Sequence, residues 1–352
     1  MKWNRRMRNT AAAGAISLPL LLSGCGMFGG SAAQIDPPPT DMETRMLEGL
    51  DAVEQTSFNP EEALSTVYLV NEQGKLAPVA LHLPEGEASL KLNRMLEMLV
   101  KDGKYAGMLP AGFSGILPAG SEVKAVTVKQ DEKLAVVEFN KAFAGYEAAD
   151  ERKILEALTW TLTETPDVEK VQLWVDGEKL NEMPVNGTPL DRPLSRSFGI
   201  NLELKGESGL SQLSPVIVYF SAATPDGVQY FVPVTRFVPA DGDRVKSAIG
   251  ELLKGPQQGD GLERVVTDNT KLDSVEVSKD GVVTVALTDD MFEAGEKLPA
   301  QMLQSLVLTV TENQDDSKVR IWLNGQKEVV GLDNQTYSEP VMRPETINEI
   351  PL

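Results

Sequence analysis

Two stretches of the chain decide its fold: LTWTLTETPDVEKVQLWVDG at residues 158–177 and LVLTVTENQDDSKVRIWLNG at residues 306–325. They match at a constant offset of 148 residues, so that Trp174 corresponds to Trp322. In each stretch, apolar residues at helical spacing are followed by an alternating strand and a turn that ends in glycine. The chain therefore contains a helix–strand unit twice, and such internal repeats are the first feature to establish in a sequence.

The repetition extends outward from these stretches, over residues 67–201 and 218–348. Each copy begins with a strand-like run that ends in proline, at Pro84 and Pro239. The apolar stripe of a first amphipathic helix follows, at Leu92, Met95, Leu96, Leu99 and Val100, and is matched by Val245, Ala248, Ile249, Leu252 and Leu253. The matched positions toward the end of each copy are Thr161 and Thr309, Thr163 and Thr311, Glu164 and Glu312, Arg196 and Arg343, and Asn201 and Asn348.

Each copy reads strand, strand, helix, strand, strand, helix, strand. Asp280-Gly281 is a typical hairpin turn between two of the alternating strands. The pattern predicts an α/β sandwich in two tandem repeats, each a mixed sheet with two helices on one face. The domain bounds that we expect are a signal peptide at 1–24, a lipidated N-terminus and proline-rich linker at 25–60, a first domain at 61–205, a linker at 206–214 and a second domain at 215–352.

The N-terminus has the features of an export signal. Lys2, Arg5, Arg6 and Arg8 precede a short apolar run from Ala11 to Leu22, which is too short to span a bilayer. The run ends in Leu22-Ser23-Gly24-Cys25, which resembles the bacterial lipobox. We therefore expect Cys25 to carry a diacylglycerol lipid after cleavage, with palmitate-type acyl chains holding the protein on the extracytoplasmic face of the cell membrane.

Composition excludes several classes of function. The 352 residues include one cysteine and one histidine, so a disulfide framework and a Cys/His zinc site are excluded. The formal net charge is −19, and removal of the signal peptide takes four basic residues and leaves about −23. So acidic a chain is repelled by phosphate backbones, and we expect no nucleic-acid partner.

Candidate chemical groups are few. His82 has Phe237 as its counterpart in the second copy, so a function built into the repeat does not use it, and we expect a half-exposed strand position. Among the carboxylates, glycan cleavage would need two at a suitable separation. Asp289-Asp290 and Asp315-Asp316 are adjacent pairs, and we expect them to be solvated turn charges.

Two further groups have alternative readings. Asp241-Gly242-Asp243 begins like a calcium loop but lacks its later ligands, which leaves calcium binding an open alternative. Trp174 and Trp322 could stack on a sugar or peptide, although the alternating apolar residues around them favour core or helix-covered positions. We assign no catalytic, cofactor-binding or metal-binding residue, and no cofactor.

The repeat resembles the GerMN domain. The resemblance rests on Leu158-Thr-x-Thr-x-Thr-Glu164, on Lys-Val-x-x-Trp-x-x-Gly at 170–177 and 318–325, and on the preceding hairpin that ends in phenylalanine. It implies a fold similar to the ring-building motifs of secretion systems and of the sporulation channel. It also implies a lipoprotein of sporulation and germination, working in the envelope between mother cell and forespore.

From the repeat and the resemblance we expect a non-enzymatic, lipid-anchored scaffold or assembly factor for a mother cell–forespore channel complex. Its partners would be the membrane, through the N-terminal lipid, and proteins of a sporulation envelope complex, with self-association left open. The alternatives are a cell-wall hydrolase that uses paired carboxylates and a binding module for peptidoglycan or a solute.

Overall fold

The computed structural model describes residues 64–84, 86–87, 90–203, 212–240, 242–293 and 295–351. All of these described residues belong to one compact unit, which contains both repeats. The signal peptide, Cys25, the proline-rich spacer and Asp241 lie outside the described residues, so the predictions made for them stay predictions.

The first repeat has the predicted order of elements, with two short strands added. Its strands and helices are β1 (Ser65–Asn71), β2 (Leu76–Leu81), α2 (Lys91–Glu97), β3 (Phe113–Ser114), β4 (Val123–Lys129), β5 (Leu134–Phe139), α3 (Glu151–Leu162), β6 (Lys170–Val175) and β7 (Glu178–Lys179). Short 3₁₀ turns occur at Ala106–Met108, Gln130–Glu132, Lys141–Ala144, Ala148–Asp150 and Arg196–Phe198.

The second repeat has the predicted order without additions. Its elements are β8 (Leu213–Ala223), β9 (Gln229–Pro239), α4 (Arg244–Leu253), β10 (Lys271–Val277), β11 (Val282–Thr288), α5 (Ala300–Asn313) and β12 (Lys318–Leu323). Gly281, at the predicted hairpin turn between β10 and β11, has a φ of 78°. That conformation favours glycine, which explains the turn signal.

Each repeat contains a mixed sheet, as the pattern predicts. In the first, β4 pairs antiparallel with β5 and β5 pairs parallel with β6; in the second, β10, β11 and β12 pair in the same way. Even a bulge is shared, between Val123 and Ala125 and between Leu272 and Ser274. The tandem α/β fold is thus confirmed.

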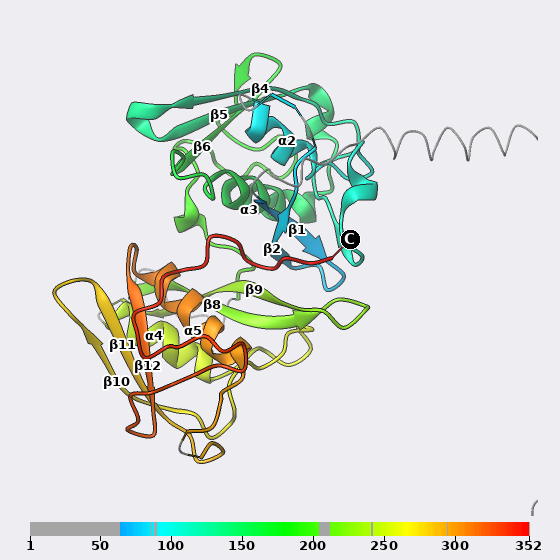
Figure 1. The fold of residues 1–352 in the computed structure, drawn as a ribbon. Helices are drawn as coiled ribbons and strands as arrows, with labels where there is room; N and C mark the ends of the chain where they lie inside the picture. The colour runs from blue at the N-terminus through cyan, green and yellow to red at the C-terminus, as the bar shows by residue number, and fades with distance from the viewer. Residues whose placement is uncertain are drawn as a thin grey trace, which may run out of the picture. The chain divides into compact units, whose positions relative to one another are not determined.

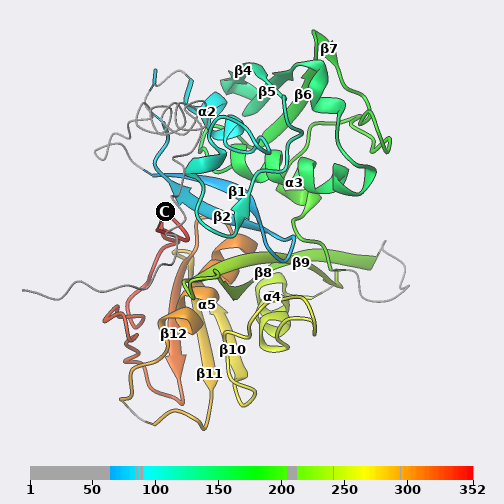
Figure 2. The ribbon, with the colours of Figure 1, turned by 90° about the vertical axis from the view of Figure 1, so that its right-hand side faces the viewer.

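The opening strands of each repeat form a separate sheet. The hairpin β1–β2 lies with β3, and the hairpin β8–β9 stands alone, so neither joins the mixed sheet of its repeat. Helices α3 and α5 contact a hairpin strand on one side and a mixed-sheet strand on the other. Figures 1 and 2 show the helices between these two layers in both repeats. Each helix is therefore covered on two faces, which accounts for its extensive burial.

The first amphipathic helix is shorter than its apolar stripe predicts. Helix α2 ends at Glu97. Just beyond it, the carbonyl of Leu99 accepts hydrogen bonds from Ile116 and Leu117 at 2.8 Å, outside the helical pattern. Gly115 permits this approach, since a Cβ at that position would lie 2.3 Å from the carbonyl oxygen of Leu99.

The apolar core crosses from one repeat to the other. The cluster that contains Trp160 and Phe139 of the first repeat also includes Tyr219, Phe231 and Ile347 of the second. A second cluster lies within the second repeat, around Phe220 and Leu306 of β8 and α5. Within the described residues, no helix is both long enough and apolar enough to cross a bilayer.

Candidate functional site: the junction between the repeats

The matched threonines of the helices α3 and α5 tie each helix to a strand. The hydroxyl of Thr161 accepts a hydrogen bond from the backbone N–H of Tyr68 on β1 at 3.0 Å. In the second repeat, Thr309 accepts from the N–H of Tyr219 on β8 at 3.1 Å. These threonines, which are poor helix formers, thus satisfy strand donors that would otherwise be buried without a partner. They also place the two tyrosines in equivalent positions.

The tyrosine hydroxyls belong to a network of charged side chains that joins the repeats. Tyr68 donates to Glu164 at 2.7 Å, and Tyr219 donates to Glu312 at 2.8 Å. The guanidinium of Arg196 donates to Glu164 at 2.6 Å and, across the junction, to Glu312 at 2.9 Å.

Arg343, the counterpart of Arg196 in the second repeat, completes this network. It forms an ion pair with Glu312 and donates a hydrogen bond to the hydroxyl of Tyr219, each at 2.9 Å. Glu312 is therefore shared by one arginine from each repeat, and its side chain is only 6% exposed. Two arginines and two glutamates balance in charge, as a mostly buried cluster requires.

The electrostatics of this network favour a structural role. Burial alone would raise the pKa of Glu312, but Arg343, Arg196 and the Tyr219 hydroxyl outweigh it and lower the pKa to about 2. The pKa of Tyr219 is raised, chiefly by burial. A general acid needs a pKa close to the working pH, and the pKa of Glu312 lies well below it. This carboxylate holds the junction together and is unsuited to proton transfer.

Two asparagines connect the hairpins of the repeats. The side chain of Asn201 accepts from the N–H of Leu76 at 2.8 Å and donates to the carbonyls of Leu76 and Pro233, at 2.7 and 2.8 Å. Asn348 makes the corresponding three bonds with Phe231 and Pro78, at 2.7 to 2.8 Å. Each asparagine thus binds one hairpin strand of its own repeat and one of the other.

The prolines in these two hairpin strands fit the arrangement. Pro78 on β2 and Pro233 on β9 have no N–H, so the strands cannot continue one ladder across the junction. Their carbonyl oxygens remain available, and each is taken by the asparagine that comes from the other repeat. The contact between hairpins is therefore specified by side chains.

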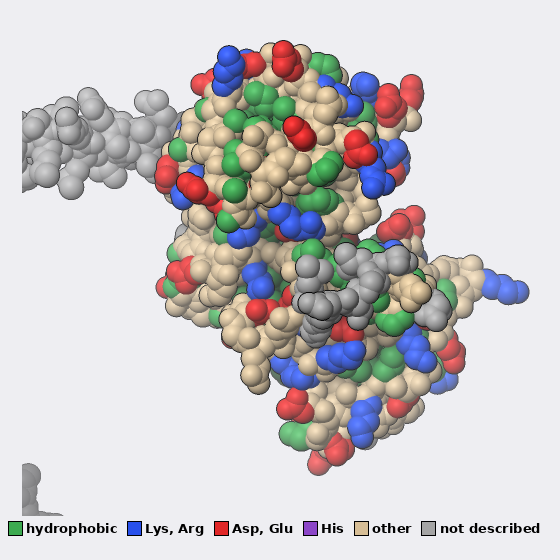
Figure 3. Space-filling model, turned by 180° about the vertical axis from the view of Figure 1, so that it is seen from behind, with side chains coloured by type: hydrophobic (Ala, Val, Ile, Leu, Met, Phe, Trp, Pro, Cys, Tyr) green, Lys and Arg blue, Asp and Glu red, His purple; other side chains and the backbone are tan. Residues whose placement is uncertain are grey.

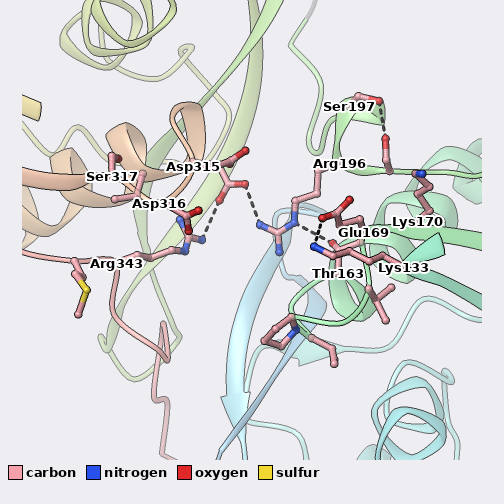
Figure 4. A pocket seen from close by; sticks show the side chains of 17 residues that line it. Lys133, Thr163, Glu169, Lys170, Arg196, Ser197, Asp315, Asp316, Ser317 and Arg343 are labelled. Carbon is pink, nitrogen blue, oxygen red and sulfur yellow. Dashed lines mark hydrogen bonds and ion pairs between the residues drawn. The ribbon is translucent and has the colours of Figure 1, made fainter. Parts of the chain in front are cut away.

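A pocket of about 980 Å³ opens beside the charged network. Figure 4 shows Asp315, Asp316 and Arg343 of the second repeat on one side of it and Lys133 and Arg196 of the first repeat on the other. Lys133 pairs with Glu169 at 2.5 Å. The lining side chains that the structure describes are charged, hydroxyl-bearing or aliphatic, with no aromatic ring among them.

The other candidate groups that the sequence offers lie outside the charged network. His82 is half-buried, as expected, but it follows directly after β2 and so lies just outside the strand in which we expected it. Asp315 and Asp316 are exposed in the turn after α5, also as expected. Asp243 caps the N-terminus of α4 by accepting from the N–H of Lys246 at 2.9 Å. Within the described residues, no group of three or more potential ligands is placed to hold a metal ion.

The prediction of a solvated turn charge is wrong for Asp289, which is 1% exposed. Its carboxylate accepts from the hydroxyls of Thr267 and Thr270, at 2.5 and 2.6 Å, and from the N–H of Met291 at 2.9 Å. Burial disfavours ionisation of this carboxyl, but the three hydrogen bonds outweigh it and lower the pKa of Asp289. The carboxylate organises the loop that follows β11.

The substitution Asp289→Asn is expected to lower the free energy of unfolding by about 1.5–3 kcal/mol, the usual worth of hydrogen bonds to a buried charge. Urea denaturation followed by tryptophan fluorescence measures this loss. The control is Asp290→Asn, since the exposed Asp290 accepts one bond from Asn269 at 2.8 Å and should change stability by about 0.5 kcal/mol or less. Equal effects of the two substitutions would contradict the structural role.

The prediction that the matched tryptophans occupy core or helix-covered positions is also wrong. Trp174 and Trp322 alternate with the buried neighbours Leu173 and Ile321, so they lie on the outer faces of the mixed sheets and are half-buried. The indole of Trp174 donates to the side chain of Gln172 at 3.1 Å, and Lys327 lies 4.9 Å from the ring centre of Trp322. Polar neighbours therefore accompany both rings.

The surface carries both signs of charge in spite of the acidic total. Figure 3 shows lysine and arginine side chains interspersed with aspartate and glutamate over the face seen there.

Comparison with known proteins agrees with this geometry. A family model described as "Sporulation and spore germination" (Germane) matches residues 66–181 and 217–329. The spore germination protein GerM of Bacillus subtilis (strain 168) is 37% identical over 350 residues, which cover 94% of each chain.

Solved structures match as well. That of the tandem GerMN domains of the sporulation protein GerM from Bacillus subtilis is 36% identical, with a TM-score of 0.75 over 82% of this chain and 100% of that chain. The solved first GerMN domain of the same protein is 38% identical and covers 38% of this chain and 98% of its own, with a TM-score of 0.36. The resemblance stated from the repeat is confirmed, and the chain belongs to the sporulation and spore germination family, with two GerMN domains in tandem.

Proposed function

We propose that this protein is a non-enzymatic, lipid-anchored assembly factor for a channel complex in the envelope between mother cell and forespore. Membership of the sporulation and spore germination family supports the setting. The observation that carries the proposal is the use of the repeat-matched polar residues. Arg196 crosses to Glu312, and Asn201 and Asn348 each cross to a hairpin of the other repeat. Glu164 and Arg343 hold these crossing groups from within their own repeats.

This use of polar groups favours placement over turnover. A repeated enzyme would keep matched ionisable groups free for substrate, whereas the matched carboxylates here are occupied by arginines and tyrosines. Two domains joined by buried charge and hydrogen bonds present their outer surfaces in a fixed relation. Such a rigid tandem suits a protein that positions other components on a membrane surface.

The lipid at Cys25 is the part of the proposal that fixes the protein in place. The substitution Cys25→Ala is expected to remove incorporation of a clickable fatty acid and to abolish focal localisation of a fluorescent fusion in sporulating cells. The control Ser23→Ala keeps a small residue before the cysteine and should retain both labelling and localisation. Unchanged melting temperature in each variant shows that folding is intact, and normal localisation of unlabelled Cys25→Ala protein would refute the anchoring role.

A further inference from the structure

The two repeats differ at one matched place, the corner between the last helix of each repeat and its closing segment (residues 196–201 and 343–348). In the first repeat, the indole of Trp160 on α3 is fully buried there, and its N–H donates to the carbonyl of Gly199 at 2.9 Å. The ring centre of Tyr68 lies 5.5 Å from that of Trp160, and the guanidinium of Arg196 lies 4.4 Å from it. The first repeat therefore closes this corner with an aromatic side chain of its own.

A second ring contact closes the same corner of the first repeat. The guanidinium of Arg152 on α3 lies 4.2 Å from the ring centre of Phe198 and donates to its carbonyl at 2.6 Å. The matched residues of the second repeat are Ala300, at an offset of 148, and Glu345, at an offset of 147. An alanine and an exposed glutamate cannot form such a stack. This contact is therefore particular to the first repeat.

The second repeat has a pocket at this corner. Helix α5 carries Leu308 at the position where α3 carries Trp160, and a pocket of about 390 Å³ opens beside it. The pocket is lined by Val307 and Leu308 of α5, by Phe231 of β9 and by Ile347 of the closing segment, among others. Its volume lies within the range of about 300–1,000 Å³ that is usual for ligand pockets. The place of the missing indole is therefore open in the second repeat.

The pocket has an apolar base and a polar rim. Phe231, Leu308 and Ile347 are buried and belong to the apolar core that crosses the junction. At the rim, the side chains of Gln335 and Glu349 are exposed. A ligand that covers such a base removes apolar surface from water, and the rim keeps the opening solvated. This combination is typical of a pocket that receives one apolar group from outside.

We propose that this pocket binds an aromatic side chain, above all a tryptophan, of a protein partner. The class of group follows from the first repeat, in which the matched corner closes around the indole of Trp160. That the group belongs to a protein rests on the proposed function as an assembly factor. Aromatic side chains that fill a pocket are among the residues that contribute most to binding between proteins.

The rim can also satisfy the polar atom of an indole. A buried indole N–H usually finds a hydrogen-bond acceptor. Gln304, which lines the pocket, uses its amide nitrogen to donate to Asp333 at 3.3 Å, so its amide oxygen can accept from a ligand. An aliphatic side chain such as leucine makes no use of this acceptor and covers less of the apolar base. The pocket therefore prefers a tryptophan to an aliphatic residue.

Methyl NMR of the mature chain tests the pocket directly, with N-acetyl-tryptophanamide as the probe. The methyl signals of Val307, Leu308 and Ile347 should shift and saturate, with a dissociation constant of about 1 mM for one side chain without the rest of its interface. N-acetyl-leucinamide should bind at least tenfold more weakly. Shifts that do not saturate, or equal affinity for the two amides, overturn the proposal.

The substitution Leu308→Trp supplies the ring from the chain itself, as Trp160 does in the first repeat. It should abolish binding of the probe without lowering the melting temperature. The control Met291→Trp adds the same ring at an exposed position outside the pocket and should bind the probe as the wild type does. If Leu308→Trp does not fold, Thr346→Trp brings the ring from the closing segment and must block the probe instead. Binding retained in the folded variant overturns the proposal.

Sporulating cells test whether the ring comes from a protein partner. A fluorescent fusion of Leu308→Trp should stay attached to the membrane, because Cys25 is intact, and should lose its focal localisation, whereas Met291→Trp keeps it. Normal foci of Leu308→Trp overturn the proposal of a partner's side chain in this pocket. The proposed function fails by a different result, which is focal localisation that persists without the lipid in Cys25→Ala.

Discussion

Replacing Glu312 by glutamine is expected to lower the free energy of unfolding by about 3–5 kcal/mol, the usual cost of removing one partner from a buried ion pair. Glu312 is the single carboxylate shared by Arg196 and Arg343, which come from different repeats. A neutral amide leaves Arg343 without a carboxylate and offers one acceptor oxygen in place of two, so it cannot bind both arginines. Urea denaturation at neutral pH measures the loss.

The matched residue of the first repeat provides the control. Glu164 binds one arginine and one tyrosine, and its side chain is 20% exposed, against 6% for Glu312. Glu164→Gln is expected to cost about 1–2 kcal/mol, because water can replace part of what is lost. Equal losses in the two variants would show that the crossing contact to Glu312 adds nothing to stability.

The same variant has a distinct dependence on pH. The pKa of Glu312 is about 2 in the folded protein, whereas an unfolded glutamate titrates near 4.3. Its stabilisation, about 3 kcal/mol from this difference, is present above about pH 4.3 and is lost as the pH falls toward 2. In Glu312→Gln, the free energy of unfolding should therefore lose this decrease between about pH 4.3 and pH 2.

Much of the fold could be predicted, because the chain states it twice. A single helical stripe or alternating run can be misassigned. The same pattern found twice at a constant offset is hard to produce by chance. The predicted order of elements is correct in both repeats. The separate hairpin sheets were not predicted. A local pattern shows that a strand is half-buried and does not show which other strand it pairs with.

The repeat indicates which residues belong to the site but does not predict the contacts that they make. Glu164, Arg196 and Asn201 were recognised as matched positions, yet their contacts depend on how the two copies face one another, which no spacing reveals. Trp174 and Trp322 were misplaced because an aromatic residue among apolar neighbours fits either face of a sheet, and the register alone decides which.

The asparagines at the hairpins should be as costly to replace as the shared glutamate. Asn348→Ala removes three side-chain hydrogen bonds, leaving the N–H and carbonyl of Phe231 and the carbonyl of Pro78 without their partner. It also places alanine at a φ of 60°, in the left-handed region that disfavours a Cβ by about 1–2 kcal/mol. The expected loss is about 3–5 kcal/mol.

Glycine at the same position separates the two causes. Asn348→Gly also deletes the side chain but is free to adopt the positive φ, so it should be about 1 kcal/mol more stable than Asn348→Ala. Asn201, at a φ of 47° with the equivalent bonds, should give the same pair of values. An alanine variant no less stable than the glycine variant would show that the backbone conformation relaxes.

The double variant Asn201→Ala, Asn348→Ala tests whether the two asparagines couple the domains. Each one spans both hairpins, so removing both takes away six side-chain bonds at the junction. The charged network, the shared apolar contacts, the Arg236–Glu203 ion pair and the backbone bonds of Thr235 with Ile200 and Glu203 remain. Because domains that lose their mutual contacts unfold independently, calorimetry should resolve two thermal transitions where the wild type shows one. A single transition at the wild-type midpoint would mean that the remaining links make the tandem rigid without the asparagine side chains.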